Sequence, residues 1–362
     1  MKKYLLPERS LPYDTLDLQQ AYLLIKYRMD HFIFFDTSIK NNYLTPREGE
    51  TKLGEVLPLC TSFTELEAST VRYVIIGIPE DIGIQANYGK PGADRTWSAF
   101  LKSFLNLQWN TYTQSQNCTI LGQVDCDDLM QEAQKILCRT SGAQPELGAL
   151  VSQLDQRVTS VIQKIVSNGK TPIIIGGGHN NSYGNIKGTS QALHRKIDVL
   201  NIDAHTDLRH PDYRHSGNGF SFAKQEGYLD RYLMFGIHKN YTPQYIFDRY
   251  GKEKQTQFKW FEELMGGSRA YQLQELQKFI APLQKGFGLE IDCDAIENFP
   301  SSAKTPSGFS LTAIRGFIGL LKNQQVQYLH LAEAADLGDG QVGKALSYLV
   351  ADFMQKESKT QL

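Results

Sequence analysis

The segment IDVLNIDAHTDLR (197–209) decides the fold class of this chain. It begins as a continuous apolar run, which is typical of a strand buried on both faces of a parallel sheet. It ends in three polar side chains, Asp203, His205 and Asp207. Alternate residues of a strand share one face, so these side chains can converge. The segment therefore predicts a parallel α/β sheet with a polar site where this strand ends.

Two further segments repeat this combination of a buried strand and a polar end. In IIIGGGHNN (173–181) the strand ends before His179, and in GFGLEIDCDAI (286–296) it ends at Asp292 and Asp294. Sites of α/β folds lie outside the carboxyl ends of the strands, so we expect the three segments to meet. A lone Asp at a strand end is more often a turn or capping residue, but three such segments in one chain favour a shared site.

The six side chains together indicate a site for divalent metal ions. Four carboxylates and two imidazoles without a thiolate suit a hard or borderline ion, and one ion cannot use them all and still bind water and substrate. We therefore expect two ions, which activate a water molecule for attack. The donor set does not choose between manganese, nickel, cobalt and zinc. Cys293 lies between two proposed ligands and should point away from them into the core.

Composition excludes some classes of partner. The chain has 362 residues, of which 41% are hydrophobic, and its 38 Lys and Arg nearly balance its 39 Asp and Glu. We therefore expect no nucleic-acid or membrane-surface partner. The start MKKYLLPERS lacks an apolar signal segment, and five cysteines without CxxC spacing favour a reduced, cytoplasmic protein. The sequence leaves open whether the chain forms a homo-oligomer.

Strand–helix alternation from about residue 71 predicts a three-layer α/β/α fold with a parallel, roughly eight-stranded sheet. The expected strands are 71–79, 118–124, 171–177, 197–203, 231–237, 257–261, 286–292 and 328–333. The clearest expected helices are 147–167, which should end at Asn168-Gly169, 312–322 and 343–356.

The first part of the chain is expected to be an addition to this fold. Residues 1–68 look like an N-terminal extension packed on the main domain, which spans residues 69–362. The extension contains a helical pattern around Leu16 to Tyr27 and an aromatic run at Phe32–Phe35, followed by a polar loop.

The motifs GGGHxxxYG, DAHTDLR and DCDxI, in this order, resemble the ureohydrolase superfamily of arginases, agmatinases and formimidoylglutamases. The resemblance covers roughly residues 71–336 and implies the parallel eight-stranded sheet of that superfamily. It also implies a binuclear manganese centre with all six ligand positions filled: bridging Asp203 and Asp292, His179 and Asp207 on one ion, and His205 and Asp294 on the other.

Within the superfamily, formimidoylglutamases look most similar. The loop DIGIQANYGKPGA (81–93), the segment GIHKNYTPQ (236–244) and Arg209 resemble that branch, and Phe220 stands where arginases have a histidine. The resemblance implies hydrolysis of N-formimidoyl-L-glutamate to L-glutamate and formamide, a step of histidine breakdown. An arginase- or agmatinase-type hydrolase that releases urea and a metal-binding relative without catalysis remain as alternatives.

The resemblance also suggests roles around the metal ions. Asp207 is expected to transfer a proton, Glu333 to bind the cationic amidine, and Arg209 and Asn218 to contact the substrate. The planar guanidinium of Arg209 suits a carboxylate, whereas its alternative is a surface ion pair with Asp212. The alternative for Glu333 is a strand-end surface residue.

Two departures from the superfamily pattern lie near the proposed site. Glu290 occupies a position where many relatives have Ser, and ENFPSSAKTPSG (297–308) replaces the usual segment after the late Asp pair. The glycines 176–178 lack the spacing of a nucleotide-binding loop and are expected to let the backbone approach the ions. His215 and His238 are expected near the site, with structural roles favoured over proton transfer.

Overall fold

The computed structural model describes residues 31–355, apart from residues 114, 140, 141 and 284. The strands of this part of the chain are β1 (Phe32–Phe34), β2 (Tyr73–Gly77), β3 (Cys118–Val124), β4 (Thr171–Ile175), β5 (Ile197–Ile202), β6 (Leu229–Ile237), β7 (Thr256–Trp260), β8 (Phe287–Asp292) and β9 (Val326–Ala332). The α-helices are α2 (Thr37–Asn41), α3 (Leu53–Val56), α4 (Phe63–Ala68), α5 (Ile82–Ala86), α6 (Thr96–Phe104), α7 (Asp127–Arg139), α8 (Gln144–Ser167), α9 (Ser182–Leu193), α10 (Gly219–Gln225), α11 (Gln244–Tyr250), α12 (Arg269–Phe279), α13 (Leu311–Leu321) and α14 (Gln341–Met354). Among these helices, none combines the length and apolar character that a membrane span requires.

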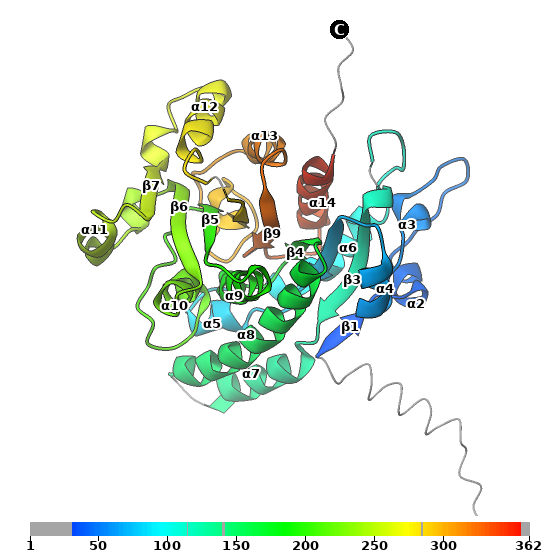
Figure 1. Cartoon of the computed structure of the whole chain (residues 1–362). Coiled ribbons are helices and arrows are strands. Elements are labelled where there is room, and N and C mark those ends of the chain that lie inside the picture. Colours follow the sequence, from blue (N-terminus) through cyan, green and yellow to red (C-terminus); the bar gives the residue numbers. More distant parts are fainter. Residues whose placement is uncertain (1–30, 114, 140–141, 284, 356–362) are drawn as a thin grey trace, which may run out of the picture.

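All nine strands belong to one sheet, in the order β1-β3-β2-β4-β9-β8-β5-β6-β7. Strands β2 to β9 pair in parallel, and each overlaps one of the eight expected ranges. Helices cover both faces of the sheet (Figure 1). The predicted three-layer α/β/α fold is therefore confirmed, with one additional strand.

The additional strand comes from the aromatic run in the first part of the chain. β1 runs antiparallel to β3 at the edge of the sheet, with Phe32 opposite Val124, and Phe32 is fully buried. Three residues are too few to show a strand periodicity, so this strand depends on tertiary pairing and was not expected from sequence.

Helices α2 to α4 interrupt the expected polar loop. The helix expected around Leu16 to Tyr27 lies outside the described residues, and the division at residue 68 stays a prediction.

The strands are apolar on both faces because helices pack on both. In β4, Ile173 and Ile175 face the core beneath α6, α13 and α14, whereas Ile174 faces the core beneath α8 and α9. Helix α8 ends at its C-cap residue Asn168, and Gly169 follows with φ of +69°, as the Asn-Gly pair predicts. The central strands are thus buried between two helical layers, and their carboxyl ends lie together at one edge of the sheet.

Candidate metal centre

The proposed ligands come from the loops that follow adjacent strands at the centre of the sheet. β4, β9, β8 and β5 are neighbours in that order. His179 follows β4, Asp292 ends β8, and Asp203 follows β5. Strand β9 leads to Glu333. Because the strands are parallel, their carboxyl ends meet at one edge, and the sheet brings these side chains together.

Four of the proposed ligands form a tight cluster. One ligand atom each from His179, Asp203, Asp207 and Asp292 lies within 4.8 Å of the other three. The Nδ1 atom of His179 is 2.9 Å from Oδ2 of Asp207, 3.0 Å from Oδ2 of Asp292 and 3.4 Å from Oδ2 of Asp203. His179 is fully buried, yet neither of its ring nitrogens makes a hydrogen bond within the described residues. A buried nitrogen without a hydrogen bond, facing three carboxylates, fits a divalent cation.

The other two proposed ligands lie beside this cluster. The Nδ1 atom of His205 is 3.7 Å from Oδ1 of Asp203 and 3.8 Å from Oδ2 of Asp294. The His205 ring stacks on Tyr241, with 5.1 Å between the ring centroids. Asp203 therefore lies between the two histidines, where it can contribute to two ion positions.

Backbone amides hold the carboxylates in place. Asp203 accepts a hydrogen bond from the amide of His205 at 2.8 Å, and Asp292 accepts one from the amide of Asp294 at 2.7 Å. Asp294 accepts one from the amide of Ala303 at 3.1 Å. These bonds fix the carboxylate planes, so that the second oxygen of Asp292 points toward His179.

The cluster concentrates negative charge inside the protein. Burial, together with the charge of Asp203, raises the pKa of Asp292 and of Asp207 above the usual value for Asp. Burial and the charge of Asp294 raise the pKa of Glu333 to about 8. Such crowding is costly without a compensating cation. It supports the view that Asp207 and Asp292 hold metal ions and that Glu333 faces a cation.

Two non-glycine residues of the site adopt left-handed backbone conformations. Asp207 has φ of +49° and Glu333 has φ of +63°. Such conformations cost free energy and tend to occur at functional sites, where the surrounding structure imposes them. Glu333 is nearly fully buried, and its Oε1 accepts a hydrogen bond from the amide of His179 at 2.6 Å. It is therefore part of the floor of the site rather than a strand-end surface residue.

One buried carboxylate was not anticipated from sequence. Glu80 accepts hydrogen bonds from the amides of Ile82 at 2.7 Å and Gly178 at 3.0 Å and from Nδ2 of Asn181 at 2.6 Å. It follows β2 closely, so the rule that identified the other strand-end carboxylates could have found it. A Cβ atom at Gly177 would lie 2.9 Å from the Glu80 carboxylate. Gly177 thus lets the loop pass close to Glu80, and the expected approach of the glycine backbone to the ions stays a prediction.

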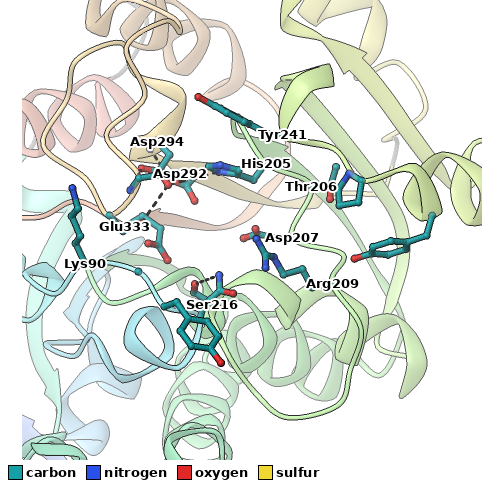
Figure 2. A pocket seen from close by; sticks show the side chains of 17 residues that line it. Lys90, His205, Thr206, Asp207, Arg209, Ser216, Tyr241, Asp292, Asp294 and Glu333 are labelled. Atoms are coloured by element: carbon teal, nitrogen blue, oxygen red, sulfur yellow. Dashed lines mark hydrogen bonds and ion pairs between the residues drawn. The ribbon is translucent and has the colours of Figure 1, made fainter. Parts of the chain in front are cut away.

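A pocket opens above the cluster (Figure 2). Its volume is about 310 Å³, and its floor includes Asp292, Asp294 and Glu333. The rim includes Lys90 and Arg209, both exposed, together with Tyr88, Asn87, Ser216, Tyr241, Tyr245, Ser302 and Ala303. Arg209 makes no side-chain ion pair with Asp212 or any other carboxylate of the described chain. It is therefore available to a ligand in this pocket.

Asn218 is placed differently from the other expected substrate contacts. It is fully buried and does not line the pocket. Its Oδ1 accepts from Nη1 of Arg214 at 2.6 Å, and its Nδ2 donates to the carbonyl of Tyr213 at 2.7 Å. The side chain thus supports the loop before α10, and the adjacent Ser216 lines the pocket instead.

The remaining residues singled out from sequence have packing roles. Phe220 stacks on Tyr232 and meets the ring of His179 edge-on, at centroid distances of 4.3 and 5.1 Å. His238 stacks on Phe261, whereas Nδ1 of His215 accepts from the amide of Gly217. Cys293 lies in the apolar core, as predicted.

Fold and site together define an α/β protein with a candidate centre for divalent metal ions at the carboxyl edge of its sheet. The sequence matches the arginase family over residues 71–355, and the chain belongs to that family.

Named relatives agree with the predicted resemblance. The formimidoylglutamase of Hahella chejuensis is 28% identical over 196 residues, which cover 51% of this chain and 53% of that protein. The formimidoylglutamase of Streptococcus pyogenes is 24% identical over 249 residues, covering 66% and 69%. The first alignment thus spans little more than half of the relative. The crystal structure of Trypanosoma cruzi formiminoglutamase with Mn²⁺ has a similar fold, with a TM-score of 0.64, 19% identity and coverage of 84% and 97%.

Proposed function

We propose that this chain is a cytoplasmic hydrolase that uses two manganese ions to cleave N-formimidoyl-L-glutamate into L-glutamate and formamide, a step of histidine breakdown. The observation that carries the proposal is the charge distribution of the pocket. Its floor holds the buried carboxylates around Glu333, and its rim holds the guanidinium of Arg209, which has no ion pair with a described carboxylate. A molecule with a cationic amidine at one end and carboxylates at the other fits this distribution.

The comparisons support this choice of substrate and metal. Both sequence relatives described above are formimidoylglutamases, and the related Trypanosoma cruzi structure contains Mn²⁺. The two ions would be held by two ligand sets that share Asp203 and Asp292. His179 and Asp207 would complete one set, and His205 and Asp294 would complete the other. When bound, the ions lower the pKa of a water molecule, which makes attack on the amidine carbon feasible near neutral pH.

The protein residues orient the substrate and move the proton. Glu333 binds the amidinium through a charge-assisted hydrogen bond, and Arg209 binds a carboxylate of the glutamate moiety. Asp207 accepts the proton of the attacking water and delivers it to the leaving nitrogen, which becomes the amino group of glutamate. Phe220 cannot transfer a proton, so no imidazole acid acts from that position.

A substrate panel on manganese-loaded protein tests the proposal. Formimidoylglutamate, arginine, agmatine and guanidinobutyrate are compared by kcat/KM, with glutamate and urea measured as products. The expected result is the highest kcat/KM for formimidoylglutamate. A higher kcat/KM for agmatine or arginine would show that the substrate is a guanidino compound. The absence of turnover by protein with two bound ions would indicate a non-catalytic relative.

A further inference from the structure

A row of polar side chains crosses the sheet directly beneath the ligand cluster. The strand register places Asn201 of β5 opposite Glu290 of β8, and Glu290 opposite His330 of β9. All three are fully buried. Because alternate residues share a face, Asp203 and Asp292 lie one step further along the same face. Polar groups in a sheet interior are costly unless they are paired, so this row requires a structural or functional reason.

Glu290 is held firmly at the centre of this row. Its Oε1 accepts a hydrogen bond from the hydroxyl of Tyr328 at 2.8 Å, and its Oε2 lies 2.5 Å from Nδ1 of His330. Nε2 of His330 faces the carbonyl of Gly176 at 3.2 Å, which fixes the ring from its other side. A Cβ atom at Gly288 would lie 2.3 Å from the Tyr328 ring, so glycine is needed for the tyrosine to cross β8.

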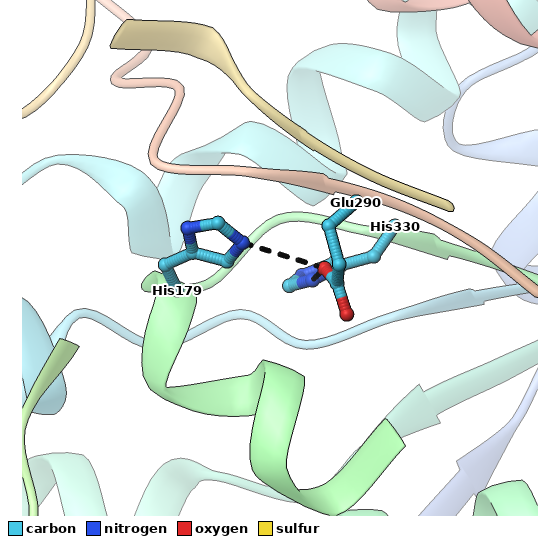
Figure 3. Close-up of side chains that lie close together, drawn as sticks. All are labelled: His179, Glu290 and His330. Carbon is cyan, nitrogen blue, oxygen red and sulfur yellow. Dashed lines mark hydrogen bonds and ion pairs between the residues drawn. The ribbon is translucent and has the colours of Figure 1, made fainter. Parts of the chain in front are cut away.

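The same carboxylate faces His179. Oε2 of Glu290 is 3.5 Å from Nε2 of His179 (Figure 3). Nδ1 of that ring faces the carboxylates of the cluster. Nε2 makes no hydrogen bond within the described residues, so the Glu290 carboxylate faces a buried ring nitrogen that needs a partner. A neutral imidazole binds a metal through one nitrogen and carries its proton on the other, and an acceptor for that proton selects the tautomer and the ring orientation.

We propose that Glu290 is the positioning residue for the metal ligand His179. It accepts the Nε2 proton of His179 and keeps the Nδ1 lone pair directed into the carboxylate cluster. Tyr328 and His330 keep Glu290 in place, so the row acts on the ion bound by His179 and not on the ion bound by His205. The inference rests on the proposed metal centre, and it is independent of the choice of substrate.

The test measures Mn²⁺ binding by titration calorimetry and by electron paramagnetic resonance. Glu290→Gln should lower the affinity for one of the two Mn²⁺ ions by about 10- to 100-fold, the usual effect of removing a hydrogen-bond partner of a metal ligand. It should also replace the signal of two coupled ions by that of a single ion. The matched control Asp198→Asn changes a carboxylate of the same sheet at the amino end of β5, away from the cluster, and should bind both ions as the wild type does.

Adding Glu290→Gln to two single-ligand variants shows which ion depends on Glu290. In His205→Ala the remaining ion depends on His179, so adding Glu290→Gln should weaken Mn²⁺ binding about 10- to 100-fold. In His179→Ala, adding Glu290→Gln should change Mn²⁺ binding little. Tyr328→Phe keeps the carboxylate of Glu290 and should lower the affinity for the same ion by a smaller factor. This variant replaces Glu290→Gln as the test if Glu290→Gln does not fold. Equal weakening of both ions, or unchanged binding in folded variants, would overturn the positioning role. Wild-type protein that binds no Mn²⁺ would instead overturn the metal centre, and this inference with it.

Discussion

The floor of the pocket and the ligand cluster beneath it consist of buried side chains near strand ends, whereas most side chains of the rim are partly or fully exposed. His179 and Asp203 have no exposed surface, and Asp292 and Glu333 are only 2% and 3% exposed. On the rim, Tyr88 is 74% exposed. The floor is fixed by sheet register and backbone hydrogen bonds, so it can hold ions in a defined geometry. The rim has few such constraints, and it is the region in which we expect substrate choice to be determined.

The largest effect should come from the centre of the floor. Asp292→Asn removes a charge that faces His179 and lies in the proposed bridging position, so both ions should be lost. The ions contribute several kcal/mol of transition-state stabilisation, so kcat/KM should fall by on the order of 10³-fold or more. Metal analysis and kinetics check this, with the exposed Asp230→Asn as the matched control. Full occupancy of both sites in Asp292→Asn would show that Asp292 is not a shared ligand.

A change at the side of the floor should have a more selective effect. His205→Ala removes a ring that lies near Asp203 and Asp294 but belongs to only one proposed ligand set. It should empty mainly one ion position and leave a protein with about one Mn²⁺ per chain. Metal analysis after dialysis measures the ratio. An equal loss of both ions would contradict the assignment of His205 to one ion.

The difference between strand-end residues and loop residues also explains which parts of the structure could be predicted from sequence. The parallel strands are continuous apolar runs with polar ends, so both the sheet and the residues of the floor follow from periodicity and from the rule that parallel strands end at one edge. The antiparallel β1 could not be predicted, because its three residues become a strand only by pairing with β3.

The buried supports of the site were also harder to predict. The expected substrate contact of Asn218 stays a prediction. In the structure its amide is used by Arg214 and Tyr213, and such pairing depends on how a loop folds back. Glu290 was noticed only as a departure from relatives. Its contact with His330 depends on strand order, which the residues of β8 and β9 do not encode locally.

Glu333 lies at the boundary between floor and rim. Glu333→Gln should retain both ions, because the amide oxygen can still accept the hydrogen bond from the backbone of His179. It should lower kcat/KM by about 100-fold, since a hydrogen bond between charged groups contributes up to about 3 kcal/mol. Kinetics and metal analysis of the same preparation separate the two effects. Loss of metal in this variant would make Glu333 a ligand or a support of one.

The smallest effect is expected on the rim, at Arg209. Its side chain extends past Gly217, where a Cβ atom would lie 3.0 Å from Cδ of Arg209, so glycine leaves space for the guanidinium to line the pocket. Arg209→Ala should raise the KM for formimidoylglutamate and leave metal content unchanged. Losing one charge-assisted carboxylate contact costs at least about 1.5 kcal/mol, and because Arg209 is exposed we expect this low end of the range, roughly a 10-fold change.

Two comparisons decide whether Arg209 acts through its shape or only through its charge. Arg209→Lys keeps the charge but loses the planar pair of donors, so its KM should lie between those of the wild type and Arg209→Ala. Lys90→Ala removes the other rim cation and should raise KM less, because an ammonium group cannot bind a carboxylate through two parallel bonds. Agmatine, which has no carboxylate, should gain rather than lose from Arg209→Ala because a repulsive charge is removed. Unaltered kinetics in Arg209→Ala would place the recognition of the substrate elsewhere on the rim, while the floor and its ions would keep their assigned roles.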